Sequence, residues 1–437
     1  MSLNDLQDRL ERQPMGTAQW GVIALCFGLN MLDGMDVLVM SYAAPLVMAE
    51  WNVAPARFGL VFSAALVGMA LGAALIAPRA DVVGRRRMVL VSALIIAIGM
   101  MASARAGGVW SLLALRGLTG LGVGAMLATL TSVAAENASA RRRNLVIGLV
   151  LSGYPIGATL TGFAIAPLLG DLGWRWLFMA AGMVSALTIP VIFILMPESL
   201  AFILKRQPAG ALEAVNQRLQ ARGLPALQTL PDVDTLALAP PSVRSLFAHG
   251  RSHTTAWLWA AFFLSFLSMY FLLSWVPKLV VNAGLGLDNA IYAGALFNLG
   301  AFFGITGLGH FSNRFGLRRL ITVFFSLTAA MMIAFGQLQA SLDSLMVMTF
   351  LLGLTMQGGF VGLYAVAARV HDTEIRTTGV GWAIGAGRTG AIIGPWLGGI
   401  TIGLGWDMDT NLAVFALPCI LAALATSRLR GAGLVPE

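Results

Sequence analysis

Long apolar runs constrain this chain more than any other feature of its sequence. A helix needs about 20 mostly apolar residues to cross a lipid bilayer, and twelve runs of that length or close to it follow one another. They lie near residues 20–46, 57–79, 88–104, 109–135, 143–170, 175–196, 254–282, 289–311, 318–337, 343–369, 376–403 and 409–426. We therefore predict an all-α membrane protein with twelve transmembrane helices.

A polar segment between the sixth and seventh runs divides the chain into two groups of six helices. Each group is long enough to form a bundle of its own. The predicted parts are an N-terminal tail (1–19), a six-helix bundle (20–196), a central loop (197–253), a second six-helix bundle (254–426) and a C-terminal tail (427–437).

Charged residues make up only 11% of the chain and hydrophobic residues 58%. A soluble domain carries about 25% charged and about 45–50% apolar residues, so the composition excludes a soluble enzyme or a nucleic-acid binder. Most of the 28 Lys and Arg residues lie in the tails and in alternate loops. The positive-inside rule then predicts that both tails and the central loop are cytoplasmic. The net charge of +8 is explained by this topology, without any nucleic-acid partner.

An internal repeat relates the two groups of helices. The segment 77–87 aligns with the segment 309–319 at a constant offset, which pairs Asp81 with Asn313 and Gly84 with Gly316. Parallel repeats of this kind are typical of secondary transporters, whose substrate site lies near the bilayer midplane between the halves. The two bundles are therefore predicted to be pseudo-symmetric, with a site between them.

The repeated loop motif and the segment 116–124, Arg-Gly-Leu-Thr-Gly-Leu-Gly-Val-Gly, resemble motifs of the major facilitator superfamily. Three further motifs resemble its aromatic acid:proton symporter family, whose members carry 4-hydroxybenzoate, benzoate or gentisate. They are Asp33-Gly-Met-Asp36, Pro197-Glu198-Ser199 and Gly387-Arg388-Thr389-Gly390. The resemblance covers the whole chain. It implies import of small aromatic carboxylates with protons across a bacterial-type inner membrane, with no cofactor besides the coupling proton.

Four charged residues lie well inside the predicted spans: Asp33, Asp36, Arg116 and Arg388. Such a charge costs about 2.5–3.5 kcal/mol at a span's centre on insertion scales, so it usually has a partner or a function. Asp33 and Asp36 are three residues apart, on one helical face. Two carboxylates this close cannot both be ionised cheaply in a low dielectric. We predict that Asp36 pairs with Arg116 and that Asp33 binds the coupling proton.

Arg388 lies in the other half and has no acidic residue in its own span. Its planar guanidinium suits two-point binding of a carboxylate, so we predict that it anchors an anionic substrate. The alternative is that all four charges form packing ion pairs without a transport role. Polar and aromatic residues within spans are predicted to complete the substrate site, although each could equally serve packing. They are Asn30, Tyr154, Asn298, Gln357, Tyr364 and Trp382.

The first loop motif is predicted to act as a gate on the cytoplasmic side. Asp81 can form ion pairs with arginines in this loop and the next, and an acidic residue near the end of the fourth span can join them. The predicted gating residues are Asp81, Gly84, Arg85, Arg86, Glu136 and Arg142. The alternative is that these arginines only fix the topology.

Motifs for other chemistries are absent from the sequence. There is no phosphate-binding loop of the ATPase type, and the four histidines show no metal-ligand spacing. We therefore predict neither an enzyme nor a metal site, and we expect a monomer. Alternative functions are proton symport of a non-aromatic organic acid or sugar acid, export of a drug or metabolite, or ligand sensing by a transporter-derived protein.

Overall fold

The computed structural model describes Gln13 and residues 15–220, 224–230, 243–248, 251–337, 342–371 and 375–429. The described chain is almost entirely helical. Its α-helices are α2 (Thr17–Trp51), α3 (Pro55–Leu71), α4 (Ala80–Val83), α5 (Arg85–Ser103), α6 (Val109–Asn137), α7 (Arg143–Leu151), α8 (Gly153–Leu195), α9 (Leu200–Arg206), α10 (Ala211–Gln220), α11 (Ser252–Asn282), α12 (Leu287–Phe315), α13 (Leu317–Gln337), α14 (Leu342–Val370), α15 (Arg376–Gly403) and α16 (Met408–Ser427). A π-helical turn η1 (Gly72–Ile76) and two 3-10 segments, η2 (Ala77–Arg79) and η3 (Val243–Leu246), complete the set.

The predicted twelve-helix membrane fold is confirmed. Ten segments of the described chain are long and apolar enough to cross a membrane, and one of them, Leu145–Leu195, holds two crossings. Its two parts meet at Gly173, whose φ of 77° breaks the helix within α8. The remaining crossing is α15, a glycine-rich helix of 28 residues.

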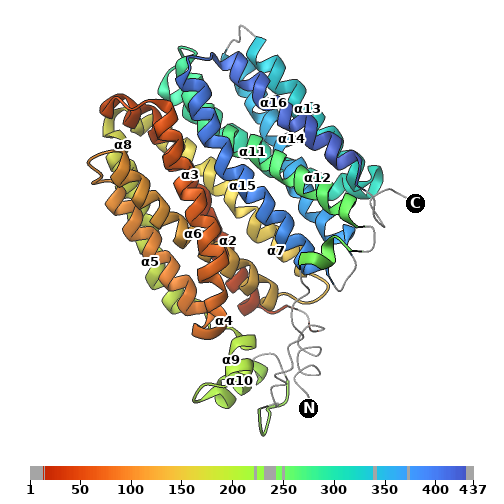
Figure 1. Cartoon of the computed structure of the whole chain (residues 1–437). Coiled ribbons are helices and arrows are strands. Elements are labelled where there is room, and N and C mark those ends of the chain that lie inside the picture. Colours follow the sequence, from red (N-terminus) through yellow and green to blue (C-terminus); the bar gives the residue numbers. More distant parts are fainter. Residues whose placement is uncertain are drawn as a thin grey trace.

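The helices form two bundles that lie side by side, with α2–α8 in one and α11–α16 in the other (Figure 1). The most extensive contacts within the first bundle join α2 to α8 and α3 to α6, and those within the second join α12 to α14 and α11 to α15. The central segment predicted as a loop contains the helices α9 and α10. These pack on each other through Ile203, Leu204 and Val215 at the end of the molecule where α4 lies (Figure 1).

Close helix packing repeats in the two bundles. A Cβ atom on Gly120 or Gly124 of α6 would overlap main-chain carbonyl oxygens of α3, and one on Gly300 or Gly304 of α12 would overlap those of α14. Small residues let helix backbones approach closely in membranes, where the hydrophobic effect between helices is weak. The glycines therefore give the two halves the same helix-to-helix geometry.

The bundles are joined by hydroxyl groups that donate to main-chain carbonyl oxygens of the other half. Ser41 Oγ on α2 donates to Leu273 O and Ser274 O of α11, at 2.8 Å and 2.9 Å. Ser63 Oγ on α3 donates to Ile392 O of α15 at 2.6 Å. Both serines lie in the parts of α2 and α3 far from α4, α9 and α10. These bonds hold the halves together toward the end of the molecule opposite α9.

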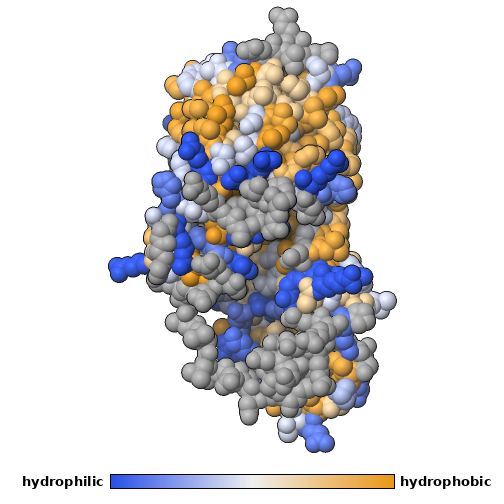
Figure 2. Space-filling model, turned by 90° about the vertical axis from the view of Figure 1, so that its right-hand side faces the viewer, coloured by the Kyte–Doolittle hydropathy of each residue, from blue (hydrophilic) through white to orange (hydrophobic). Residues whose placement is uncertain are grey.

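Apolar side chains also cover much of the outer surface of the bundles. Leu187, Phe193 and Ile194 of α8 are 69%, 63% and 76% exposed. In Figure 2, apolar residues cover the upper part of the face shown, while hydrophilic ones gather toward its lower part. A surface of this kind fits the hydrocarbon of a bilayer.

The glycine contacts predict a sharp difference between two similar substitutions. Gly124→Ala should lower the free energy of unfolding by about 1–3 kcal/mol, because α3 and α6 must move apart to admit the new methyl group. Gly28→Ala in α2 is the matched control, since nothing lies within 4 Å of its added Cβ, and it should leave stability unchanged or raise it. Thermal unfolding in detergent measures both. Equal melting temperatures for the two variants would contradict this packing.

Candidate functional site

A closed ion pair lies in the core of the first bundle, between α2 and α6. Arg116 Nη1 and Nη2 donate to Asp36 Oδ1 and Oδ2, each at 3.2 Å, and Nη2 also donates to Asp36 O at 3.3 Å. Arg116 is 1% exposed and Asp36 is 2% exposed. This two-point geometry is the strong form of a charged hydrogen bond. The expected pairing of Asp36 with Arg116 is therefore present, and it satisfies both charges.

Asp33 lies one turn from this pair on α2 but does not join it. Its side chain is buried, and its Oδ1 atom has no hydrogen-bond partner among the described residues. It interacts electrostatically with Asp36 on its own helix and with Arg388 on α15 of the other bundle. Asp33 is thus a buried carboxyl group that faces a cation across the boundary between the halves.

Arg388 lies among residues from three other helices. Its guanidinium interacts electrostatically with Tyr270 on α11, Tyr364 on α14 and Asp33 on α2. Its Nη1 atom is buried without a hydrogen-bond partner in the described chain. Buried N–H donors nearly always have a hydrogen-bond partner. The Nη1 atom is therefore available to an incoming acceptor such as a carboxylate.

Aromatic rings form a wall beside Arg388. The Phe266 ring centroid lies 4.6 Å from that of Phe360 on α14 and 6.0 Å from that of Tyr270, on which it stacks. The ring of Tyr364 lies 5.7 Å from Phe360. A Cβ on Gly387 would lie 2.7 Å from Phe266, so α15 runs close against this wall. Aromatic faces next to a cation can bind a planar ring that carries a carboxylate.

Two of the predicted pocket residues lie near this centre. Tyr364 contacts the aromatic wall, and Tyr154 on α8 interacts electrostatically with Asp33 and Tyr270. Gln357 is buried on α14, seven residues before Tyr364 and hence on the same helical face. Their part in substrate binding remains a prediction.

The other predicted pocket residues have main-chain or surface contacts instead. Asn30 Nδ2 donates to Val150 O at 2.7 Å and to Leu151 O at 3.2 Å, which fixes α2 against the end of α7. Asn298 Nδ2 donates to Gly294 O at 2.9 Å within α12. Trp382 is 47% exposed and stacks on Trp259, with ring centroids 5.9 Å apart. Asn30 lies one turn before Asp33 on α2, and its Oδ1 atom, like that of Asn298, is buried without a hydrogen-bond partner among the described residues. The part of these three residues in substrate binding remains a prediction.

Sequence reasoning did not single out Tyr270, Phe266 or Phe360. A signal was present for the first two, because Phe262, Phe266 and Tyr270 recur at intervals of four residues. That spacing places three aromatic rings on one face of α11. The hydroxyl of Tyr270 gives this face its polar contact with Arg388.

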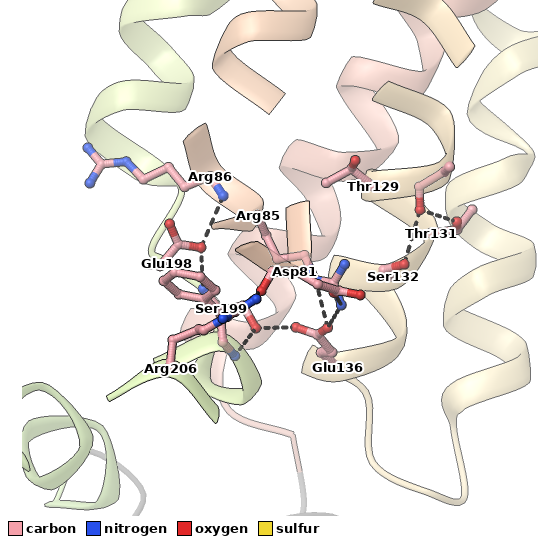
Figure 3. Close-up of polar contacts among 12 residues, drawn as sticks. Asp81, Arg85, Arg86, Thr129, Thr131, Ser132, Glu136, Glu198, Ser199 and Arg206 are labelled. Carbon is pink, nitrogen blue, oxygen red and sulfur yellow. Dashed lines mark hydrogen bonds and ion pairs between the residues drawn. The ribbon is translucent and has the colours of Figure 1, made fainter. Parts of the chain in front are cut away.

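A second cluster of charges lies at the end of the molecule where α4 and α9 meet (Figure 3). Arg85 bridges two acids, since its Nη2 atom lies 2.8 Å from Asp81 Oδ1 and 2.9 Å from Glu136 Oε1. Ser199 donates to Glu136, and Arg206 Nε on α9 donates to Asp81 O at 3.1 Å. We name Asp81, Arg85, Glu136, Glu198, Ser199 and Arg206 the inner cluster.

Glu198 links this cluster to the N-terminus of α5. Its Oε1 atom accepts from the main-chain N–H groups of Arg86, at 3.1 Å, and Ser199, at 2.9 Å. A carboxylate at a helix N-terminus is favoured by the helix dipole and by the free N–H groups there. Gly84 has a φ of 107°, and a Cβ there would collide with Glu198. Gly84 therefore permits the turn between α4 and α5 and also leaves room for the carboxylate of Glu198.

The remaining predicted gating residues differ in their placement. The Arg86 side chain donates to Phe193 O and stacks over the Phe193 ring, 4.8 Å from its centroid. Arg142 is exposed in the turn between α6 and α7. Glu198, Ser199 and Arg206 were not predicted as gating residues. A signal for the first two was present in the motif at 197–199, whose contact with the first loop motif only the fold reveals.

Comparison with known proteins gives concordant results. The model of the Major Facilitator Superfamily matches residues 25–336 and 293–432. A gallate transporter of Pseudomonas putida is 33% identical over 96% of this chain and 94% of its own length. The 4-hydroxybenzoate transporter PcaK of Pseudomonas aeruginosa is 32% identical over 99% and 96%. The inward-open structure of the xylose transporter XylE from E. coli superposes with a TM-score of 0.72 at 18% identity, covering 94% of this chain and 96% of its own.

The Asp36–Arg116 pair predicts a non-additive effect on stability. Removing one partner of a buried pair leaves an uncompensated charge and costs about 3–5 kcal/mol. Asp36→Asn and Arg116→Gln should therefore each lower the melting temperature in detergent more than the double variant does. The matched control is Glu50–Arg175, an exposed pair at 2.7 Å, whose removal should cost only about 0–1 kcal/mol. Additive losses at Asp36 and Arg116 would show that the two side chains are not coupled.

The inner cluster predicts that a substitution in it changes the rate of transport rather than folding or membrane insertion. Asp81→Ala removes one acid from Arg85 but leaves Glu136 in contact with it, so the protein should still insert into membranes and unfold at a similar temperature. Transport should slow several-fold, because the ion pair that joins α4 to Arg85 at the start of α5 is lost. Asp171→Ala, an exposed acid on α8, is the control. Transport by Asp81→Ala at the parent's rate would contradict a gating role.

Proposed function

The chain belongs to the major facilitator superfamily, and we propose that it imports small aromatic carboxylates together with protons. Relatives at about one third identity over nearly the whole chain are named for gallate and 4-hydroxybenzoate. Both acids are planar rings that carry one carboxylate and at least one hydroxyl group. The site between the two bundles has groups of matching chemistry.

The observation that carries this proposal is the free N–H donor of Arg388 beside an aromatic wall. Arg388 would bind the substrate carboxylate, and Tyr270 would hold the guanidinium in place. The rings of Phe266, Phe360 and Tyr364 would pack on the aromatic ring of the substrate. Such an arrangement favours a flat apolar body with one anionic end.

Proton coupling follows from the position of Asp33 between two charges. While Arg388 is unoccupied, its positive charge helps to keep Asp33 ionised. A substrate carboxylate on Arg388 would compete with Asp33 for that charge, which favours protonation of Asp33. One proton would then enter with each carboxylate, so the net charge at the site stays constant. Asp36 is already occupied by Arg116, which donates two hydrogen bonds to its carboxylate.

Movement of the substrate would come from rocking of the two bundles about this central site. The hydroxyl bonds of Ser41 and Ser63 join the halves at one end. The inner cluster holds α4, α5 and α9 together at the other end. Alternating access requires that contacts at one end form as those at the other break.

The setting of this activity is the bacterial-type cytoplasmic membrane, with both termini on the cytoplasmic side. The bias of Lys and Arg supports this orientation. A monomer holds every residue assigned to the central site, and the only coupling ion is the proton. No reaction on the substrate is proposed, since transport requires none.

Uptake by purified protein in liposomes tests the proposal. Labelled 4-hydroxybenzoate, benzoate and gallate should accumulate when the outside is more acidic than the inside, and a sugar acid or a lipophilic cation should not. Without the pH gradient, accumulation above the equilibrium level should cease. Gradient-driven accumulation of a sugar acid in preference to aromatic acids would assign the protein to another substrate class.

Two variants separate the two halves of the proposal. Asp33→Asn should abolish proton-driven accumulation while still exchanging labelled for unlabelled substrate across the membrane, because the anchor is intact. Arg388→Lys should raise the apparent KM about tenfold or more, since an ammonium cannot reproduce the two-point contact of a guanidinium. Accumulation by Asp33→Asn at the parent's level would remove Asp33 from the coupling step. An unchanged KM in Arg388→Lys would remove Arg388 as the anchor.

A further inference from the structure

Tyr42 on α2 lies at the boundary between the two bundles, and its side chain is 0% exposed. A Cβ atom on Gly162 of α8 would lie 2.8 Å from the Tyr42 hydroxyl oxygen. A Cβ atom on Gly294 of α12 would lie 2.8 Å from the ring atom Cε1 of Tyr42. The ring therefore fills a notch with one glycine wall in each bundle, which we name the glycine notch.

The glycine notch lies where α8 and α12 pack on each other. Thr159 Oγ1 of α8 donates to Ala295 O of α12 at 3.3 Å, and a Cβ atom on Gly162 would lie 2.6 Å from Ala295 Cβ. Ser41, the residue before Tyr42, joins α2 to α11. The notch is thus complete only while the bundles meet at the end of the molecule opposite α9.

The hydroxyl of Tyr42 is buried in this notch without a hydrogen-bond partner among the described residues. Burial of a hydroxyl without a partner is unfavourable, whereas the ring of a Phe would fill the same space without that cost. Proteins leave few buried polar groups unpaired, and each one needs an explanation. The position of this hydroxyl, at a boundary that the proposed transport cycle must open, supplies one.

We propose that the Tyr42 hydroxyl destabilises the conformation in which the bundles are closed at this end, and so keeps the two access states of the transporter close in free energy. The inference rests on alternating access in the proposed function. When the bundles tilt apart at this end, Gly294 moves away from Tyr42 and water can reach the hydroxyl. The unfavourable burial is then present in one state and absent from the other, and only such a difference shifts a two-state equilibrium.

The buried hydroxyl opposes several contacts that favour closure. Ser41 and Ser63 donate to main-chain carbonyl oxygens of the other bundle. The ring of Trp275 on α11 packs edge-on against that of Phe62 on α3, with centroids 5.3 Å apart. If these contacts were unopposed, few molecules would be open at this end, and the apparent affinity for a substrate arriving there would fall by the same fraction.

Tyr42→Phe tests the proposal because it keeps the ring and removes only the hydroxyl. Spin labels at Asp171→Cys of α8 and Asp288→Cys of α12, two exposed positions in different bundles, measure the separation of the bundles in liposomes. The native Cys26 and Cys419 are both buried. In Tyr42→Phe the ratio of short to long distances should rise about tenfold, because the closed state no longer contains an unpaired hydroxyl.

Gly294→Ala should shift the equilibrium in the opposite direction. Its methyl group would lie 2.8 Å from the Tyr42 ring, so closure is hindered and the long distance should become more frequent. Tyr42→Phe added to Gly294→Ala should move the ratio back toward the short distance. This background makes the effect of the hydroxyl measurable even if the parent protein shows the short distance alone.

Tyr292→Phe is the matched control. Tyr292 of α12 also lies at the boundary between α8 and α12, with its ring centroid 5.8 Å from that of Phe163, but its side chain is only partly buried. Its substitution should leave the distance ratio unchanged. If Tyr42→Phe behaves like Tyr292→Phe in both backgrounds, the hydroxyl has a partner such as a buried water, and the proposal is overturned.

Uptake measurements distinguish a failure of this inference from a failure of the proposed function. The distance measurement needs neither substrate nor a pH gradient. If Tyr42→Phe shifts the distance ratio but the parent protein accumulates no aromatic acid, the symport proposal fails and the role of Tyr42 stands. If the parent protein accumulates aromatic acids but Tyr42→Phe leaves the ratio unchanged, only the role of Tyr42 is wrong.

Discussion

The cost of placing charge in hydrocarbon is the constraint on which the rest of this structure depends. The backbone meets it by forming helices, in which every central N–H and C=O group is bonded within the chain. Charged side chains reduce this cost by pairing. Asp36 and Arg116 neutralise each other with two hydrogen bonds. Asp33 and Arg388 instead face each other across the two bundles without a closed pair. In the proposed symport, a substrate and a proton would complete the charge balance of this centre.

The two bundles repeat their packing but not their chemistry. Glycines bring α3 close to α6 and α12 close to α14 in the same manner, so the two frames are alike. The carboxyl groups of the centre, however, come from the first bundle, and Arg388 and the aromatic wall come from the second. In the proposed rocking movement, the distance between Asp33 and Arg388 would change. Coupling can arise from that geometry without any signal passing through the helices.

The sequence was sufficient to predict those features that depend on the length of apolar runs and on the free-energy cost of charge within the membrane. Apolar length predicted the helices, and the cost of an unpaired charge inside a span led to the predicted pairing of Asp36 with Arg116. It was insufficient where a side chain bonds to a main-chain carbonyl of another helix, as Asn30 does with Val150. Every residue has a main-chain carbonyl, so residue types do not reveal which carbonyl a side chain will bond. A buried Asn therefore has the same sequence pattern in a substrate site and in a packing contact. Tyr270 and Glu198 were missed because their partners lie far away along the chain.

The hydroxyl bonds between the bundles are of a strength that a bound substrate would offset. Each hydroxyl-to-carbonyl bond contributes about 0.5–1.5 kcal/mol net, so the bonds made by Ser41 and Ser63 amount to a few kcal/mol at most. A ligand shifts a two-state equilibrium only by its difference in affinity for the two states. One charged hydrogen bond gained at Arg388, worth about 1.5–3 kcal/mol, is of the same order. In the proposed mechanism, one carboxylate on Arg388 would therefore offset the hydroxyl bonds of Ser41 and Ser63, while the packing of α3 on α15 and of α8 on α12 keeps the bundles in contact.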